Sequence, residues 1–135
     1  MDFKRLAATY LATTVVFFAV DMAWLGVVAK GFYRRHMGAL LADRVNWTAA
    51  IVFYLLFIAG ILVFAVFPAL ERGSLGRAAL LGCLFGLMTY ATYDLTNLAT
   101  LEGFPPIVAF VDLAWGTVLT GVVSTAGFLV ARHLG

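Results

Sequence analysis

The chain has 135 residues, of which 64% are hydrophobic and 12% are charged, and its formal net charge is +2. Soluble domains carry about 45–50% apolar and about 25% charged residues, so this apolar surplus is larger than a core of this size can bury. The composition therefore excludes an ordinary soluble domain, and the scattered lysines and arginines leave no basic surface for nucleic acid. We expect the lipid bilayer to surround most of the chain.

Four apolar stretches are long enough to cross a bilayer as helices, which takes about 20 residues each. They show none of the alternation that marks the strands of a membrane barrel. We predict an all-α membrane protein in which residues 1–135 form a single domain, an antiparallel bundle of four transmembrane helices. The expected spans are residues 6–29, 47–67, 78–101 and 105–131.

The first connection, residues 30–46, is the only one with length to spare. Apolar and basic side chains are mixed along it, which is typical of a short amphipathic helix lying among the lipid headgroups. A solvated loop with a few apolar residues fits the pattern equally well. The apolar residues are Phe32, Tyr33, Met37, Leu40 and Leu41, and the basic ones are Arg34, Arg35 and Arg44.

Prolines and small residues shape the other three helices. Pro68 follows the second apolar run and Pro105-Pro106 opens the fourth, where a missing backbone N–H is tolerated. The third and fourth spans are joined by a very short turn, so we expect these helices to be tight antiparallel neighbours. Gly82 and Gly86 in the third span form a small-xxx-small pair that permits close approach of another helix.

Three aspartates interrupt the apolar spans: Asp21, Asp94 and Asp112. Each costs about 2.5–3.5 kcal/mol at the centre of a membrane helix, so we expect all three to face the bundle interior. Counting along the helices at a rise of about 1.5 Å per residue places them, together with Tyr54, roughly 10–12 Å below the same membrane surface. The sequence thus predicts one polar layer to which every helix contributes.

Two tryptophans accompany the aspartates at helical spacing. Trp24 lies three residues after Asp21, and Trp115 lies three residues after Asp112, so each shares a helix face with its aspartate. Because the first and fourth helices are antiparallel, we expect one indole ring above the polar layer and the other below it. The alternatives are an interfacial anchor for Trp24 and a packed ring with its N–H bonded to an aspartate for Trp115.

The third helix adds further polar groups, since Tyr90, Asp94 and Asn97 share one face with Tyr93 beside them. We predict that this layer binds a substrate or an ion. No catalytic residue is assigned, and no pair of cysteine or histidine residues indicates a metal or another cofactor. The predicted site residues are Asp21, Trp24, Tyr54, Tyr90, Tyr93, Asp94, Asn97, Asp112 and Trp115.

Four phrases in these helices resemble those of a bacterial family of predicted membrane proteins, Domain of Unknown Function 2177. The likeness covers nearly the whole chain. It implies a multi-pass protein of the bacterial inner (plasma) membrane with four spans, and it implies no activity. The phrases are Asp21-Met-Ala-Trp-Leu-Gly26, Phe53-Tyr54-Leu, Tyr93-Asp94-Leu-Thr-Asn97-Leu-Ala-Thr100 and Asp112-Leu-Ala-Trp-Gly116.

Three kinds of function fit a buried acidic layer. The best guess is small-molecule or proton-coupled transport, because carboxylates inside a bundle are typical of proton and ion pathways. A membrane enzyme of lipid or isoprenoid metabolism would use two carboxylates as general acid and base, or three with Asn97 to hold a divalent cation. An assembly subunit of a membrane complex would use the layer to set helix register.

Access to the layer distinguishes these functions. An aqueous vestibule would favour transport, and a lateral opening lined by apolar side chains would favour a lipid substrate. A four-helix chain is small for a transport path, so a transporter would need a homo-oligomer or another membrane partner.

Overall fold

The computed structural model describes residues 1–135, and helices account for nearly all of them. α1 (Phe3–Ala23) runs into a π-helical turn (Trp24–Val28) and is followed by α2 (Phe32–Met37) and a 3₁₀ turn (Gly38–Leu40). α3 (Trp47–Ile61) continues through a second π-helical turn (Leu62–Val66) into α4 (Phe67–Arg72). The last two helices are α5 (Leu75–Thr100) and α6 (Pro106–Leu134).

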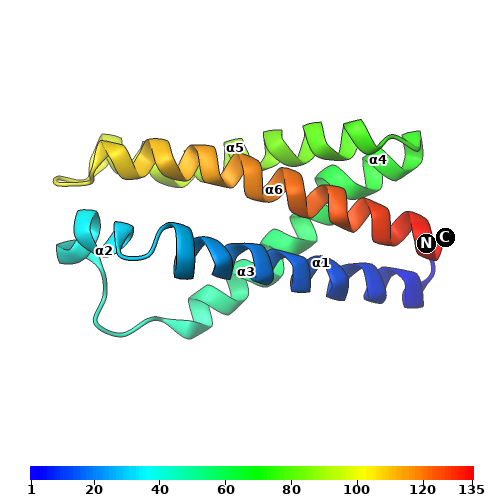
Figure 1. The fold of residues 1–135 in the computed structure, drawn as a ribbon, viewed down its shortest axis with the longest axis horizontal. Helices are drawn as coiled ribbons and strands as arrows, with labels where there is room; N and C mark the ends of the chain where they lie inside the picture. The colour runs from blue at the N-terminus through cyan, green and yellow to red at the C-terminus, as the bar shows by residue number, and fades with distance from the viewer.

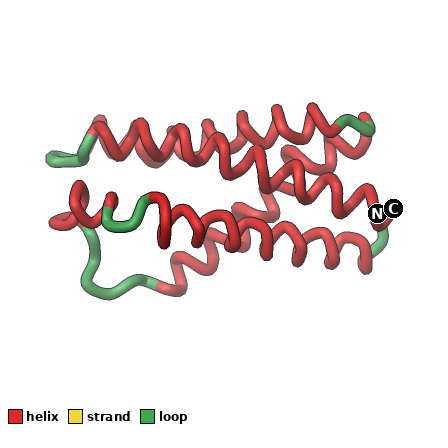
Figure 2. The backbone as a smooth tube through the Cα atoms, in the orientation of Figure 1, coloured by secondary structure: helices red, strands yellow, loops and turns green.

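Four helices are long and apolar enough to cross a membrane, which confirms the predicted fold class. The termini meet at one end of the bundle, and α2 lies at the opposite end, near the turn between α5 and α6 (Figure 1). The loops are confined to these two ends (Figure 2). The spans are Phe3–Val28, Trp47–Arg72, Leu75–Thr100 and Pro106–Leu134.

The second span is longer than the sequence predicts, whereas the ends of the other three differ from prediction by no more than three residues. Instead of ending near Phe67, the helix continues past Pro68 to Arg72. Pro68 follows the π-helical turn, in which the N–H of Phe67 bonds to the carbonyl of Leu62, five residues back. A wider turn accommodates the proline ring and its missing N–H, which would break a regular helix.

α6 is the central helix, with α1 on one side and α5 on the other, and buried residues recur along its whole length. α1 buries one residue per turn: Thr9, Thr13, Phe17 and Asp21. Residues spaced four apart lie on one side of an α-helix and can therefore pack against a single neighbouring helix. Asp21 therefore lies on the inward-facing stripe of α1 together with Thr9, Thr13 and Phe17.

α5 and α6 approach each other closely through glycines. A Cβ atom added to Gly82 would overlap the side chain of Ser124, and one added to Gly86 would overlap Thr120. One turn further along, a Cβ on Gly116 would overlap the ring of Tyr90. The contacts therefore recur every four residues, forward along α5 and backward along α6, as expected for antiparallel helices packed through small residues.

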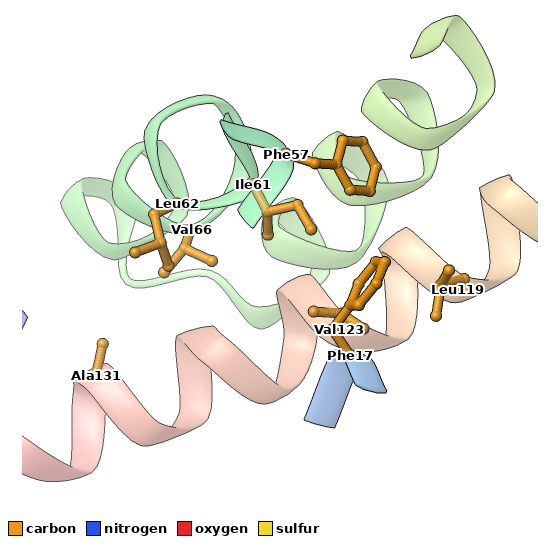
Figure 3. Packing of buried hydrophobic residues seen from close by; sticks show 8 residues of the cluster. All are labelled: Phe17, Phe57, Ile61, Leu62, Val66, Leu119, Val123 and Ala131. Carbon is orange, nitrogen blue, oxygen red and sulfur yellow. The ribbon is translucent and has the colours of Figure 1, made fainter. Parts of the chain in front are cut away.

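The apolar core lies between the second span and α6, and Phe17 of α1 closes it (Figure 3). The beginning of α3 lies outside this core, since Trp47, Ile51 and Leu55 are all more than half exposed. In a bilayer these side chains contact lipid. The core side chains are Phe17, Phe57, Ile61, Leu62, Val66, Leu119, Val123 and Ala131.

Replacing Gly86 with alanine is expected to destabilise the bundle, because the new Cβ would overlap the carbonyl oxygen of Gly116 and the side chain of Thr120. Overpacking costs about 1–3 kcal/mol, which exceeds the roughly 1 kcal/mol that alanine gains over glycine in a helix. The measurement is the Tm of the detergent-solubilised protein. In the control, Gly76→Ala on the same helix, the nearest atom is Ser74 Oγ at 3.9 Å. An equal loss of Tm in both variants would contradict the close packing.

Candidate functional site

The two Asp-x-x-Trp phrases, one on α1 and one on α6, contact each other. Nε1 of Trp115 donates a hydrogen bond to Oδ1 of Asp21 at 3.2 Å. The rings of Trp24 and Trp115 stack, with centroids 4.4 Å apart and planes 9° from parallel. Because the helices are antiparallel, equal spacing in the two phrases places each tryptophan on the level of the other helix's aspartate.

Tyr33 of α2 completes the second half of this arrangement. Its hydroxyl donates to Oδ1 of Asp112 at 2.6 Å and accepts from Nε1 of Trp24 at 3.1 Å. Trp24 is therefore connected to Asp112 through one phenol, just as Trp115 is connected directly to Asp21. Burial, together with the hydrogen bond to Asp112, raises the pKa of Tyr33, so its hydroxyl keeps its proton and acts as a donor at physiological pH.

The stacked tryptophans correct one prediction. The two rings do not lie above and below the polar layer, because the register of α1 and α6 brings them face to face within it. The alternative for Trp115 is the one observed: its ring is packed and its N–H is bonded to an aspartate. Trp24 also uses its N–H inside the protein, toward Tyr33.

α2 is a short helix with an apolar side and a basic side, so residues 32–37 of the first connection agree with the helical alternative, whereas Leu40 and Leu41 are exposed. Its apolar side packs against a small cluster where α5 turns into α6, and its basic side chains are exposed. Sequence reasoning missed Tyr33 as a site residue because it lies outside the apolar spans, although it shares the apolar face of this helix with Met37. The apolar residues are Phe32, Tyr33 and Met37, the cluster is Phe104, Val108 and Ala109, and the basic residues are Arg34, Arg35 and His36.

Tyr90 of α5 lies opposite Gly116 of α6. Four residues further along α5 and four residues back along α6, the next pair is Asp94 and Asp112, and both aspartates line one pocket. The side chain of Asp94 is 0% exposed, and neither of its carboxyl oxygens accepts a hydrogen bond from an N–H or hydroxyl group. Leaving a buried polar group unpaired costs about 1–3 kcal/mol, and more if the group is charged. Apart from the carboxyl of Asp112, which lies within hydrogen-bonding reach, no side chain is placed to pair with Asp94.

The pocket beside these two aspartates has a volume of about 350 Å³. All of its lining residues belong to α3, α5 and α6, and none is basic. Phe53 and Tyr93 are 49% and 56% exposed, so the pocket opens on the side of the bundle between α3 and α5. The lining residues are Phe53, Thr89, Tyr90, Tyr93, Asp94 and Asp112.

The structure divides the predicted site residues into three groups. Asp21, Trp24, Asp112 and Trp115 belong to the hydrogen-bonded and stacked network. Tyr90, Tyr93 and Asp94 line the pocket, and Asp112 belongs to both groups. Tyr54 packs among the rings of Phe17, Phe18 and Phe53, and Asn97 lies outside the pocket wall. The role of all nine predicted residues in binding a substrate or an ion stays a prediction.

The three aspartates do not converge on one point. Asp21 bonds to Trp115, whereas Asp94 and Asp112 line the pocket. No group of three acidic, histidine or cysteine side chains is placed to hold a metal ion. This geometry does not support a divalent cation held jointly by the three aspartates.

Both the network and the pocket lie within the part of the chain that matches a known family. The family profile, described as "Predicted membrane protein (DUF2177)", matches residues 6–129. The chain belongs to this family. The match confirms the resemblance indicated by the four sequence phrases, and it identifies a membrane protein without describing an activity. No curated protein and no solved structure matches the chain.

Replacing Tyr33 with phenylalanine is expected to loosen α2, because the lost hydroxyl connects Trp24 to Asp112. A hydrogen bond to a charged group contributes about 1.5–3 kcal/mol. We expect faster amide hydrogen exchange in residues 32–37, measured by mass spectrometry, with α6 unchanged. The control is Tyr54→Phe, which removes a hydroxyl outside this chain of hydrogen bonds. Unchanged exchange in Y33F would show that the hydroxyl does not hold α2.

Proposed function

We propose that this membrane protein is a small proton-coupled transporter and that Asp94 and Asp112 form its coupling site. The observation that carries the proposal is the carboxyl group of Asp94, which is buried in a pocket wall beside the carboxyl of Asp112 and has no N–H or hydroxyl donor. A carboxylate held for structure has a donor, as Asp21 has in Trp115. An ionisable group inside a membrane protein is by default a candidate for a proton or ion pathway.

The charge balance of the pocket supports this role. Two ionised carboxylates in one pocket repel each other, and no basic side chain lines the pocket to neutralise them. Either a proton on one carboxyl group or a bound cation relieves this repulsion. Because the two compete for the same negative charge, binding of a cation releases a proton to water and protonation releases the cation. That competition is the elementary step of proton-coupled exchange.

The position of the opening indicates where a solute enters. The pocket opens between α3 and α5, beside the half-exposed rings of Phe53 and Tyr93, rather than into a polar vestibule at a bundle end. A solute that partitions into the bilayer can reach it from the side. The first turns of α3, which are exposed, form one side of this opening.

The same lateral opening favours a second candidate, a membrane enzyme of lipid or isoprenoid metabolism. Asp94 and Asp112 would then act as general acid and base on a substrate from the bilayer. The two functions differ in outcome: an enzyme changes the composition of the lipid extract when the protein is deleted, whereas a transporter moves a solute against its gradient.

Transport is tested in proteoliposomes under an imposed pH gradient. We expect the wild-type protein to accumulate at least one solute from a mixture of amines, amino acids, organic acids and dyes, detected by mass spectrometry of the vesicle contents. Asp94→Asn should reduce this accumulation by at least about tenfold, equivalent to about 1.4 kcal/mol, because an amide cannot take up the coupled proton. Dissipating the gradient should have the same effect.

The matched control is Asp43→Asn, the same change of charge in the exposed first connection, which should leave accumulation unchanged. Equal accumulation by wild type, D21N, D94N and D112N would refute the transport proposal. A changed lipid extract without any gradient-driven accumulation would instead support the enzyme.

A further inference from the structure

We propose that the pocket beside Asp94 and Asp112 binds a small organic cation, an amine or quaternary ammonium group attached to an apolar group. The inference rests on the proposed function and names the class of solute for that site. Three features of the pocket carry it: its uncompensated acidic groups, its aromatic wall and its opening toward the bilayer.

The acidic groups select for positive charge. Asp94 has two buried oxygens without donors, and Tyr33 donates to only one oxygen of Asp112. Since no lysine, arginine or histidine lines the pocket, the solute must supply the positive charge. A neutral solute would leave the charge of the two carboxylates uncompensated, and an anion would add repulsion in this buried site.

The aromatic wall selects an ammonium group over a metal ion. Phe53, Tyr90 and Tyr93 supply three of the six lining residues. Aromatic faces attract ammonium groups through cation–π interaction, most strongly where water is excluded. A metal ion needs several converging oxygen ligands, and the acidic residues of this chain form no such group.

The size and position of the pocket select a compact amphiphile. Its volume of about 350 Å³ is near the lower end of the range for small-molecule sites, about 300–1,000 Å³. The lateral opening between Phe53 and Tyr93 lies on a helix surface that lipid surrounds. A cation with an apolar group concentrates at the boundary between headgroups and acyl chains, from which it can enter sideways.

Protons should compete with this cation. The titratable groups around the pair Asp94 and Asp112 are Asp21 of α1, Tyr33 of α2, and Tyr90 and Tyr93 of α5, with Tyr54 of α3 beside Asp21 and Tyr90. All of them are acids, so protonation can only remove negative charge from the site, and none of these groups can supply positive charge. Binding of a cation should therefore weaken as the pH falls.

The test compares two probes of the same shape, benzyltrimethylammonium and neopentylbenzene, in which carbon replaces the charged nitrogen. Binding to the purified full-length protein in a neutral detergent is measured by equilibrium dialysis. We expect saturable binding of benzyltrimethylammonium that weakens at low pH, and only unsaturable partitioning of neopentylbenzene into the micelles. Asp94→Asn should weaken binding of the cation by at least about tenfold, equivalent to about 1.4 kcal/mol, and Asp43→Asn should leave it unchanged.

A second pair of variants keeps the test valid if D94N does not fold. Tyr93 is 56% exposed, so its substitution disturbs the bundle little. Tyr93→Phe keeps the aromatic face and should keep the affinity, whereas Tyr93→Leu should weaken it by about threefold to tenfold through the lost cation–π contact. Equal affinities in Y93F and Y93L would overturn the aromatic site.

Two outcomes separate this inference from the proposed function. If the protein accumulates a neutral or anionic solute under a pH gradient but shows no saturable binding of benzyltrimethylammonium, the cation site is overturned and transport stands. If benzyltrimethylammonium binds saturably and D94N abolishes binding, but no solute accumulates under the gradient, the cation site is supported and transport is overturned.

Discussion

The close packing of α5 against α6 determines where the acidic groups of this protein lie. Gly82, Gly86 and Gly116 leave no room for a Cβ, so the two helices can approach only in the register that places these glycines opposite Ser124, Thr120 and Tyr90. The same register puts Asp94 opposite Asp112, and both line one pocket. The glycines thus contribute indirectly to the site. Without a hydrophobic driving force between helices in lipid, such packing of small residues is the main source of specific association.

The repeated Asp-x-x-Trp phrase serves the other interface of α6. The two copies lie side by side on antiparallel helices. Trp115 therefore donates a hydrogen bond to Asp21, and Trp24 is connected to Asp112 through the hydroxyl of Tyr33. Each acidic group is thereby given a donor without a basic residue entering the membrane, where a lysine or arginine is as costly as an aspartate. The stacked indole rings shield these hydrogen bonds. The repeat therefore has a physical explanation in reciprocal pairing, and it requires no duplication of the chain.

The helices can be predicted from the sequence because each apolar run is long enough to cross a bilayer. The inward orientation of the aspartates follows from the free-energy cost of a charged group in hydrocarbon. The contact between Gly86 and Gly116 could not be predicted in the same way. The spacing of small residues indicates that a helix can approach closely, but it does not identify the residue that each glycine contacts. Tyr33 could not be assigned, since nothing in the first connection shows that α2 folds back over the end of the bundle. The π-helical turn before Pro68 was also unforeseen, because it depends on how the helix adapts to the ring and not on apolar periodicity.

Asp112 is the residue through which the two halves of the site act on each other. On one side its Oδ1 accepts the hydrogen bond from Tyr33 of α2, and on the other it shares the pocket with Asp94. A hydrogen bond to an ionised carboxylate is roughly twice as strong as one to a neutral group. Protonation of Asp112 would therefore weaken the attachment of α2, whereas a proton held by Asp94 would leave that attachment intact. The proton that relieves the repulsion in the pocket is accordingly better held by Asp94, whose carboxyl has no competing donor.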